Sequence, residues 1–104
     1  MAEPERKTLL GEGQLAQARG EIPHWDFNDD RFARAFEFAN FIEAFGFMSQ
    51  VALIAERLDH HPEWSNVWNK VRIEITNHDA GGVTELDVEF CRRVDGLVGR
   101  GETR

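Results

Sequence analysis

The sequence has a single cysteine, Cys91, among its 104 residues. One thiol excludes an internal disulfide, and the scarcity of cysteine fits a reducing compartment. No apolar run approaches the roughly 20 residues that span a bilayer, and the first residues lack the apolar stretch of a signal peptide. We therefore expect a cytoplasmic protein with no membrane partner.

Basic residues are also scarce, and they are scattered. Nineteen acidic residues against twelve basic ones give a formal net charge of −7. Direct nucleic-acid binding draws its affinity mainly from neutralised phosphates, so this charge argues against it. A glycine-rich phosphate loop is missing too, because Gly81 and Gly82 lack the spacing and the preceding strand of a dinucleotide motif. A protein partner that itself binds DNA remains open.

Hydrophobic residues, by contrast, are sufficient for a core. They make up 41% of the chain and include eight Phe and three Trp. A chain of this length buries roughly two thirds of its unfolded surface but is too short for two cores. We expect a single domain over residues 9–98, with a disordered tail at residues 1–8 and a flexible tail at residues 99–104.

Local patterns predict helices alternating with β-hairpins. A short helix could span residues 9–19, although Gly11 and Gly13 disfavour it. The later elements are a hairpin over residues 24–38 with its turn at 28–30, a helix over 40–58, a hairpin or one bulged strand over 63–76, a loop over 78–82 and a helix from 84. This order predicts an α+β fold, in which a four-stranded antiparallel sheet has helices packed on one face.

The helix over residues 40–58 has the strongest pattern. Asn40 and Glu43 form a start that resembles a capping box. The apolar residues that follow cover an arc of roughly 180°, wider than the stripe of a typical surface helix. The helix must therefore lie along the sheet, and we expect it to contact something else as well. Ile42 and Leu53, on its polar side, are either a subunit contact or isolated exposed residues.

Three histidines are the candidate functional residues. His60 and His61 stand side by side where the long helix must stop before Pro62. His78 follows the second hairpin, which can fold it back towards the pair. Neighbouring histidines at a helix end are often ordinary surface residues favoured by the helix dipole, and we expect His24 to be a surface residue as well.

A histidine site could take one of two forms. Three histidines could bind zinc and leave a position for water, but adjacent residues seldom converge on one ion and no His-Glu-x-x-His spacing is present. The alternative is acid–base chemistry, since the unperturbed pKa of histidine is about 6.5. Glu56 and Asp59 could orient an imidazole and Trp64 could stack on a flat ring. They could equally be two solvated charges and a core tryptophan.

Several motifs around these histidines match a known family. Residues 51–64 read VALIAERLDHHPEW, residues 66–71 read NVWNKV and residues 76–84 read TNHDAGGVT. Upstream, FEF at residues 36–38 and AFGFM at residues 44–48 extend the match. The chain thus resembles the pterin-4a-carbinolamine dehydratase family, which includes a dimerisation cofactor of a hepatocyte nuclear factor, over roughly residues 25–97.

The resemblance implies a fold, an activity and a set of residues. The fold is helices on one face of a four-stranded antiparallel sheet, self-associating as a homodimer or homotetramer. The activity is dehydration of 4a-hydroxytetrahydropterin to quinonoid dihydropterin, which recycles the pterin used by aromatic amino acid hydroxylases. The pterin is the substrate, and neither a metal nor another cofactor is implied. The family's catalytic histidines fall on His60, His61 and His78, and substrate-binding residues are expected at Glu56, Asp59, Trp64 and Asp79.

The implied chemistry suits these residue types. Loss of hydroxide from a ring carbon needs a general acid, and a base must take a ring N–H proton, each worth typically 10²- to 10⁴-fold in rate. By resemblance His61 serves the leaving hydroxyl, and His60 and His78 serve the other proton or the pterin edge. The alternative is a non-catalytic module that binds a transcription factor, as some relatives do. The retained histidines favour the enzyme, with a hydroxylase or a transcription factor as a candidate partner.

Overall fold

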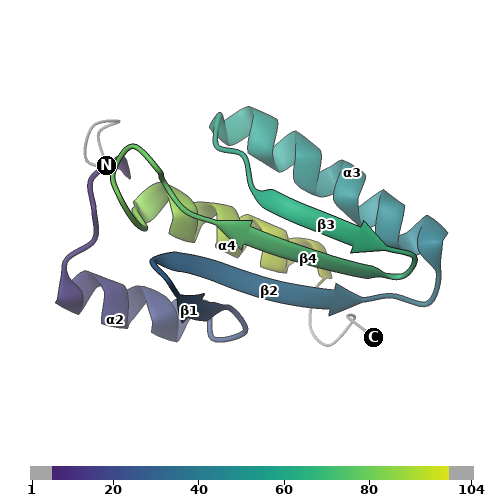
Figure 1. The fold of residues 1–104 in the computed structure, drawn as a ribbon, viewed down its shortest axis with the longest axis horizontal. Helices are drawn as coiled ribbons and strands as arrows, with labels where there is room; N and C mark the ends of the chain where they lie inside the picture. The colour runs from purple at the N-terminus through teal and green to yellow at the C-terminus, as the bar shows by residue number, and fades with distance from the viewer. Residues whose placement is uncertain (1–5, 99–104) are drawn as a thin grey trace.

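A computed structural model describes residues 6–98 and places three helices on one face of a four-stranded antiparallel sheet (Figure 1). Most of the two predicted tails, residues 1–5 and 99–104, lies outside the described residues. The strand order is β1-β2-β4-β3, so the two hairpins join along β2 and β4. The predicted α+β fold is confirmed. The elements are α2 (Glu12–Glu21), β1 (Asp26–Asn28), β2 (Arg31–Glu37), α3 (Phe41–Leu58), β3 (Glu63–Val67), β4 (Lys70–Ile75) and α4 (Glu85–Val98).

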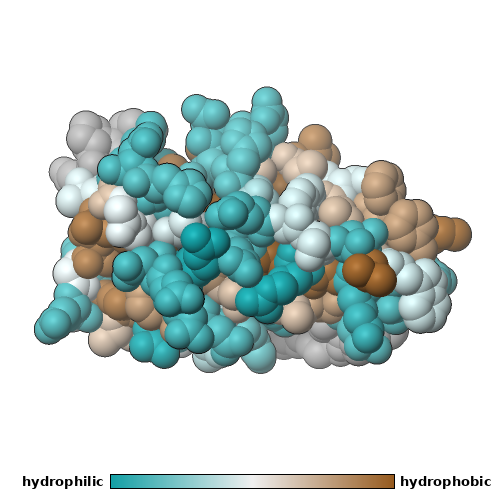
Figure 2. Space-filling view, in the orientation of Figure 1, coloured by the Kyte–Doolittle hydropathy of each residue, from teal (hydrophilic) through white to brown (hydrophobic). Residues whose placement is uncertain are grey.

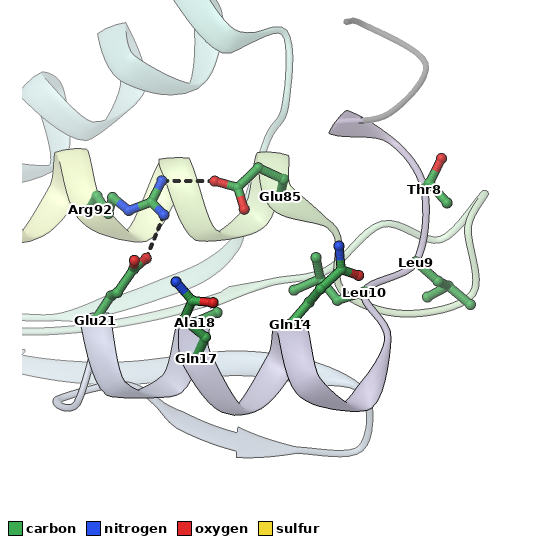
Figure 3. A pocket seen from close by; sticks show the side chains of 9 residues that line it. All are labelled: Thr8, Leu9, Leu10, Gln14, Gln17, Ala18, Glu21, Glu85 and Arg92. Atoms are coloured by element: carbon green, nitrogen blue, oxygen red, sulfur yellow. Dashed lines mark hydrogen bonds and ion pairs between the residues drawn. The ribbon is translucent and has the colours of Figure 1, made fainter. Parts of the chain in front are cut away.

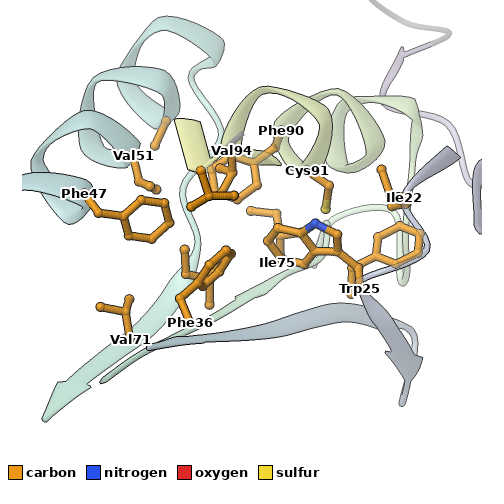
Figure 4. Close-up of a cluster of buried hydrophobic side chains, with 14 of the residues drawn as sticks. Ile22, Trp25, Phe36, Phe47, Val51, Val71, Ile75, Phe90, Cys91 and Val94 are labelled. Atoms are coloured by element: carbon orange, nitrogen blue, oxygen red, sulfur yellow. The ribbon is translucent and has the colours of Figure 1, made fainter. Parts of the chain in front are cut away.

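The core lies between the sheet and the helices. The register of β2 and β4 sets Phe32 opposite Ile75 and Phe36 opposite Val71, with all four side chains on the helix side. Each of them is at most 2% exposed. Figure 4 shows how helix residues close over this apolar face from α3 and α4. The helix side chains labelled there are Phe47, Val51, Phe90, Cys91 and Val94.

The first helix begins later than the sequence predicted. The structure has α2 at Glu12–Glu21, and not from Leu9. Leu9 forms a bridge with Thr84, and the Leu10 N–H donates to the Val83 carbonyl over 3.1 Å. The prediction was wrong at this end because apolar spacing cannot reveal a pairing with a segment so distant in the sequence.

The first strand is displaced as well. β1 begins at Asp26, so the predicted strand residues His24 and Trp25 precede it. The two turn residues, Asp29 and Asp30, have φ values of 51° and 58°, a left-handed conformation that aspartate tolerates better than most residues. Trp25 turns inward and is 4% exposed, whereas His24 is exposed as predicted.

A partly buried ion pair clamps α4 onto β2. The Arg34 guanidinium lies over the ring of Phe36, 4.5 Å from its centroid, and donates to Asp95 over 2.6 Å. The Trp25 indole N–H donates to the same carboxylate oxygen over 2.7 Å. Asp95 on α4 is thus the shared acceptor of Arg34 from β2 and of Trp25 from the segment before β1.

The start of α3 follows the predicted capping pattern with one difference. The Asn40 side chain accepts from the Glu43 N–H over 2.9 Å, as expected. The Glu43 carboxylate accepts from the Ala39 N–H and not from that of Asn40. From this start the helix runs for eighteen residues and ends at Leu58, two residues before His60. A well-capped helix therefore leads directly to the histidine pair.

Only part of the wide apolar arc of α3 faces the core. The buried residues of this helix are Ala44, Phe47, Val51 and Ala55. One edge of the arc points outward, where Phe41 is 46% exposed and Phe45 is 56% exposed. Ile42 and Leu53 are exposed too, at 81% and 71%. The helix therefore lies along the sheet as predicted, and it keeps an uncovered apolar side.

The sheet face opposite the helices is polar (Figure 2). Arg31 donates to Glu63 and Glu74 across three strands, and Arg72 also contacts Glu74. The hydrogen bond from Arg31 lowers the pKa of Glu74, against the opposing effect of partial burial. Hydrophobic residues gather at one end of this view, where Figure 1 shows the β3–β4 turn and the start of α3. Within the described residues, no helix combines the length and apolar character needed to cross a bilayer.

Candidate active site

The junction between α3 and β3 separates the two adjacent histidines. Asp59 ends the helix in a left-handed conformation, with φ 51° and ψ 46°, and its N–H caps the carbonyls of Ala55 and Glu56. The N–H of His60 also donates to the Ala55 carbonyl over 3.0 Å. This turn, followed by Pro62, releases the chain from the helix and directs His60 inward.

His60 is held by a buried carboxylate. Its Nε2 lies 2.5 Å from Asp87 Oδ1, and the two side chains are 12% and 0% exposed. The other Asp87 oxygen accepts from the Thr84 N–H over 2.6 Å and from the Thr84 hydroxyl over 3.0 Å. These contacts satisfy a carboxylate that would be costly to bury alone. They also fix the ring of His60, whose Nδ1 is the nitrogen left for another partner.

His61 is directed to the surface. Its side chain is 58% exposed, and its Nε2 lies 2.9 Å from Oε1 of Glu56, which is 80% exposed. An exposed pair of this kind contributes little to stability. The arrangement nevertheless gives His61 a carboxylate neighbour while its ring stays open to a small molecule.

His78 lies on a tight loop that closes between β4 and α4. Asn77 exchanges backbone hydrogen bonds with Gly82 at the base of the loop, and Gly81 supplies a φ of 84° within it. His78 is 73% exposed, and its Nε2 lies 3.5 Å from Oε1 of Glu63. Because Glu63 follows Pro62 directly, this contact brings the loop to the segment that carries the histidine pair.

The predicted substrate-binding residues near this junction differ in their exposure to solvent. Trp64 is 36% exposed on the edge strand β3, so it is neither a core residue nor fully open. Asp59 and Asp79 are both exposed. Asp79 extends from the same loop as His78, and Asp59 follows the last turn of α3. The structure thus brings all the predicted residues to one end of the sheet, where α3 ends and the 77–82 loop closes.

Asp87 is a site residue that the sequence did not reveal. Asp87 lies in the first turn of α4, where its carboxylate accepts from the N–H and the hydroxyl of Thr84. Its contact with His60, 27 positions earlier, is a tertiary one. An acidic residue three positions after a capping threonine is too common a pattern to have indicated a histidine partner.

Two other kinds of chemistry find little support in the geometry. Among residues 6–98, no group of three or more His, Cys, Asp or Glu side chains is arranged so that it could hold a metal ion. Burial raises the pKa of the Cys91 thiol well above its usual range, and the nearby charges of Asp95 and Asp87 act in the same direction. The thiol therefore stays protonated within the core and is not an activated nucleophile.

The arrangement offers three imidazoles, each beside its own carboxylate. His60 contacts Asp87, His61 contacts Glu56 and His78 contacts Glu63. An imidazole beside a carboxylate is a residue combination used in general acid–base catalysis. A sequence model of the family described as pterin 4 alpha carbinolamine dehydratase matches residues 8–97.

The chain belongs to the pterin-4a-carbinolamine dehydratase family. A protein of Prochlorococcus marinus strain NATL2A that carries the provisional name of this dehydratase is 44% identical over 91 residues, covering 88% of this chain and 96% of its own length. A Bordetella avium protein with the same provisional name is 52% identical over 83 residues, covering 78% of this chain and 77% of its own. The family resemblance deduced from the histidine motifs is thereby confirmed.

Solved structures of the family have the same fold. A Brucella melitensis protein described as a transcriptional coactivator/pterin dehydratase superposes with a TM-score of 0.82 at 41% identity, over 86% of this chain and 98% of its own. A pterin dehydratase-like protein described as a RuBisCO assembly factor of the alpha-carboxysome matches with a TM-score of 0.61 at 20% identity, over 74% and 89%. The second likeness shows a shared fold alone.

Proposed function

We propose that the protein dehydrates 4a-hydroxytetrahydropterin to quinonoid dihydropterin and water, and so recycles a pterin cofactor used by aromatic amino acid hydroxylases. The observation that carries the proposal is the set of three histidine–carboxylate pairs at the α3–β3 junction, in a chain of this family. The reaction needs proton transfer at two places on one small molecule, and the three histidines are groups suited to such transfer.

The reaction requires one acid and one base. In our proposal His61 protonates the hydroxyl on the saturated ring carbon, so that the carbon–oxygen bond breaks and water leaves. His60 or His78 accepts the ring N–H proton, and the released electron pair forms the carbon–nitrogen double bond. The net change is loss of water, without oxidation or a covalent enzyme intermediate. Each proton transfer supplies typically 10²- to 10⁴-fold in rate.

The carboxylates hold the imidazoles in place through direct contacts. Asp87, with its bonds to Thr84, holds the His60 ring most firmly because this pair is buried. The pairs of His61 with Glu56 and of His78 with Glu63 are exposed, so they leave both rings free to adjust around a substrate. We assign Trp64 to the face of the pterin ring, where its partly exposed indole can stack. Asp59 and Asp79 complete the proposed pocket as polar contacts to the substrate.

The proposal is tested with the variant His61→Ala. This histidine is 58% exposed, so its removal should leave the fold intact and still lower turnover by about 10²-fold or more. Turnover is measured by absorbance after freshly generated 4a-hydroxytetrahydropterin is mixed with the protein, against the uncatalysed rate in buffer. The matched control is His24→Ala, which removes an exposed histidine outside the site and should retain full activity.

Two outcomes would contradict this assignment. Unchanged turnover in folded His61→Ala would remove the histidine mechanism, and no acceleration by the unaltered protein would remove the dehydratase activity. The same assay with a chelator separates acid–base chemistry from metal catalysis. The acid–base mechanism predicts unchanged turnover after chelation, whereas a zinc site predicts its loss.

A second candidate function is protein binding, and two exposed surfaces favour it. The outward side of α3 exposes Phe41, Ile42 and Phe45, and the edge strand β3 has one side unpaired within the described residues. We propose that these surfaces support a homodimer or homotetramer. A transcription factor helix or an aromatic amino acid hydroxylase is the alternative occupant, and the related Brucella melitensis protein is described as a transcriptional coactivator.

A further inference from the structure

We infer that Leu9 is a positioning residue for His60 and His78, although the structure shows no contact between it and either ring. The inference rests on the proposed function only in treating these histidines as catalytic groups. Leu9 belongs to the N-terminal segment, residues 9–10, which crosses from the described start of the chain to α2 (Figure 3). This segment lies against the chain between the His78 loop and α4, so it can act on both of them.

The N-terminal segment pairs with the residues that lead into α4. The Leu10 N–H donates to the Val83 carbonyl over 3.1 Å, and Leu9 forms an antiparallel bridge with Thr84. Leu10 is partly buried and packs on the core, which anchors the segment. Thr84 is completely buried, so its backbone position is set by these neighbours and not by solvent.

One line of contacts runs from the segment to His60. The Thr84 backbone pairs with the backbone of Leu9, and the Thr84 N–H and hydroxyl both donate to Asp87. Asp87 in turn contacts His60 Nε2 over 2.5 Å. A shift of the Thr84 backbone would therefore move the carboxylate that sets the orientation of the His60 ring.

A second line of contacts runs to His78. Gly82 closes the His78 loop through its two backbone hydrogen bonds with Asn77. A Cβ atom placed on Gly82 would lie 2.9 Å from Leu9 Cδ2 and 3.6 Å from Asp30 Cβ, so the Leu9 side chain lies directly against the loop base. Leu9 thus pairs through its backbone with the support of His60 and lies with its side chain against the support of His78.

The Leu9 side chain should matter more for the placement of the histidines than for the stability of the fold. It is 49% exposed, so truncating it removes only part of the hydrophobic stabilisation of a buried leucine. Catalytic groups, by contrast, are sensitive to small displacements, since misplacement by about 1 Å can cost 10²-fold in rate. We therefore expect Leu9→Ala to lower kcat by about tenfold while KM and the melting temperature change little.

The matched control is Leu15→Ala. Leu15 is a partly buried leucine of α2 that packs on the core, away from the backbone pairing of Leu9 and Leu10 with residues 83–84. This control should lower stability at least as much as Leu9→Ala while leaving kcat unchanged. A merely structural role for Leu9 predicts the same pattern in both variants.

Imidazole NMR provides a readout that does not depend on activity. In Leu9→Ala the ring signals of His60 and His78 should shift, those of His61 should shift less and those of the exposed His24 should stay in place. Because this result requires no turnover, it tests the positioning role even if the protein proves to have no dehydratase activity. Unchanged His60 and His78 signals in the folded variant would overturn the inference, as would an unchanged kcat in an active enzyme.

The contact itself is tested by a double substitution. Gly82→Ala should shift the His78 signals, because the added methyl group meets Leu9 Cδ2. Combining it with Leu9→Ala removes that collision, so the two effects should not add. Additive shifts in the double variant would contradict a direct contact between Leu9 and the loop base.

Discussion

At the scale of single residues, the same side-chain type has three different environments in one site. His60 is buried against Asp87, whereas His61 and His78 are largely exposed beside Glu56 and Glu63. The buried pair is fixed in geometry, because movement of its ring would take away the partner of Asp87 Oδ1 in the core. The exposed pairs can rearrange at small cost. The site therefore combines one rigid group with two adaptable ones.

The rigid pair leads to a prediction for Asp87→Asn. An amide can retain acceptor bonds from Thr84, but it would present an N–H donor to His60 and force the ring into the opposite tautomer. We expect turnover to fall by about 10²-fold and the free energy of unfolding to fall by about 1–3 kcal/mol. Turnover is followed by absorbance and stability by urea denaturation.

The control for this change is Asp26→Asn, which alters an exposed carboxylate on β1. It should leave both quantities near those of the unaltered protein. Full turnover in Asp87→Asn would show that the buried carboxylate has no part in catalysis, whatever its effect on stability.

At the scale of elements, α3 and the segment after it decide where the histidines lie. The helix is capped by Asn40 at its start and ends in the left-handed Asp59, directly before the pair. Capping at the start acts through helix stability alone, since the whole eighteen-residue helix separates that end from the pair. The two ends of one helix should therefore respond differently to substitution.

This difference gives a prediction for Asn40→Ala. Loss of the side-chain bond to the Glu43 N–H should lower the free energy of unfolding by about 1 kcal/mol. Turnover at a temperature where the variant is folded should not change. Denaturant unfolding measures the first effect, and Asn40→Ser, which keeps a capping oxygen, should restore most of the stability. A loss of turnover in the folded variant would contradict the separation of the two ends.

Elements were predictable from sequence where a local pattern determines them. The span of α3 followed from its apolar spacing, its cap and Pro62, and the segment over residues 63–76 forms a hairpin, one of the two forms predicted for it. The start of α2 and the inward turn of Trp25 were not predictable, because distant partners determine them. The site divides in the same way. The histidine motif was recognisable in the sequence, whereas Asp87 was recognisable only by its tertiary contact.

At the scale of the whole molecule, the charge and the apolar surface are unevenly distributed. The open face of the sheet is polar, while the outward side of α3 carries exposed Phe41, Ile42 and Phe45. Contiguous exposed apolar residues of this kind are typical of association surfaces. Repulsion from a net charge of −7 opposes association, so the apolar contact has to outweigh it.

The proposed self-association predicts the behaviour of Phe45→Ser. The mass measured by light scattering should be a multiple of 11.9 kDa for the unaltered protein and should fall in this variant. Gln50→Ser, an exposed polar position on the same helix, is the control and should leave the mass unchanged. A monomeric unaltered protein would contradict the homo-oligomer and favour a different partner for this side of α3.

The three tryptophans differ in exposure, at 4% for Trp25, 36% for Trp64 and 62% for Trp68, and the chain contains no tyrosine. Intrinsic fluorescence therefore comes from three distinct reporters. Emission from Trp25 follows the integrity of the core, and emission from Trp68 follows the solvent at the hairpin tip. Trp64 lies at the proposed pterin pocket, so quenching of its emission offers a direct optical measure of substrate occupancy, separate from turnover.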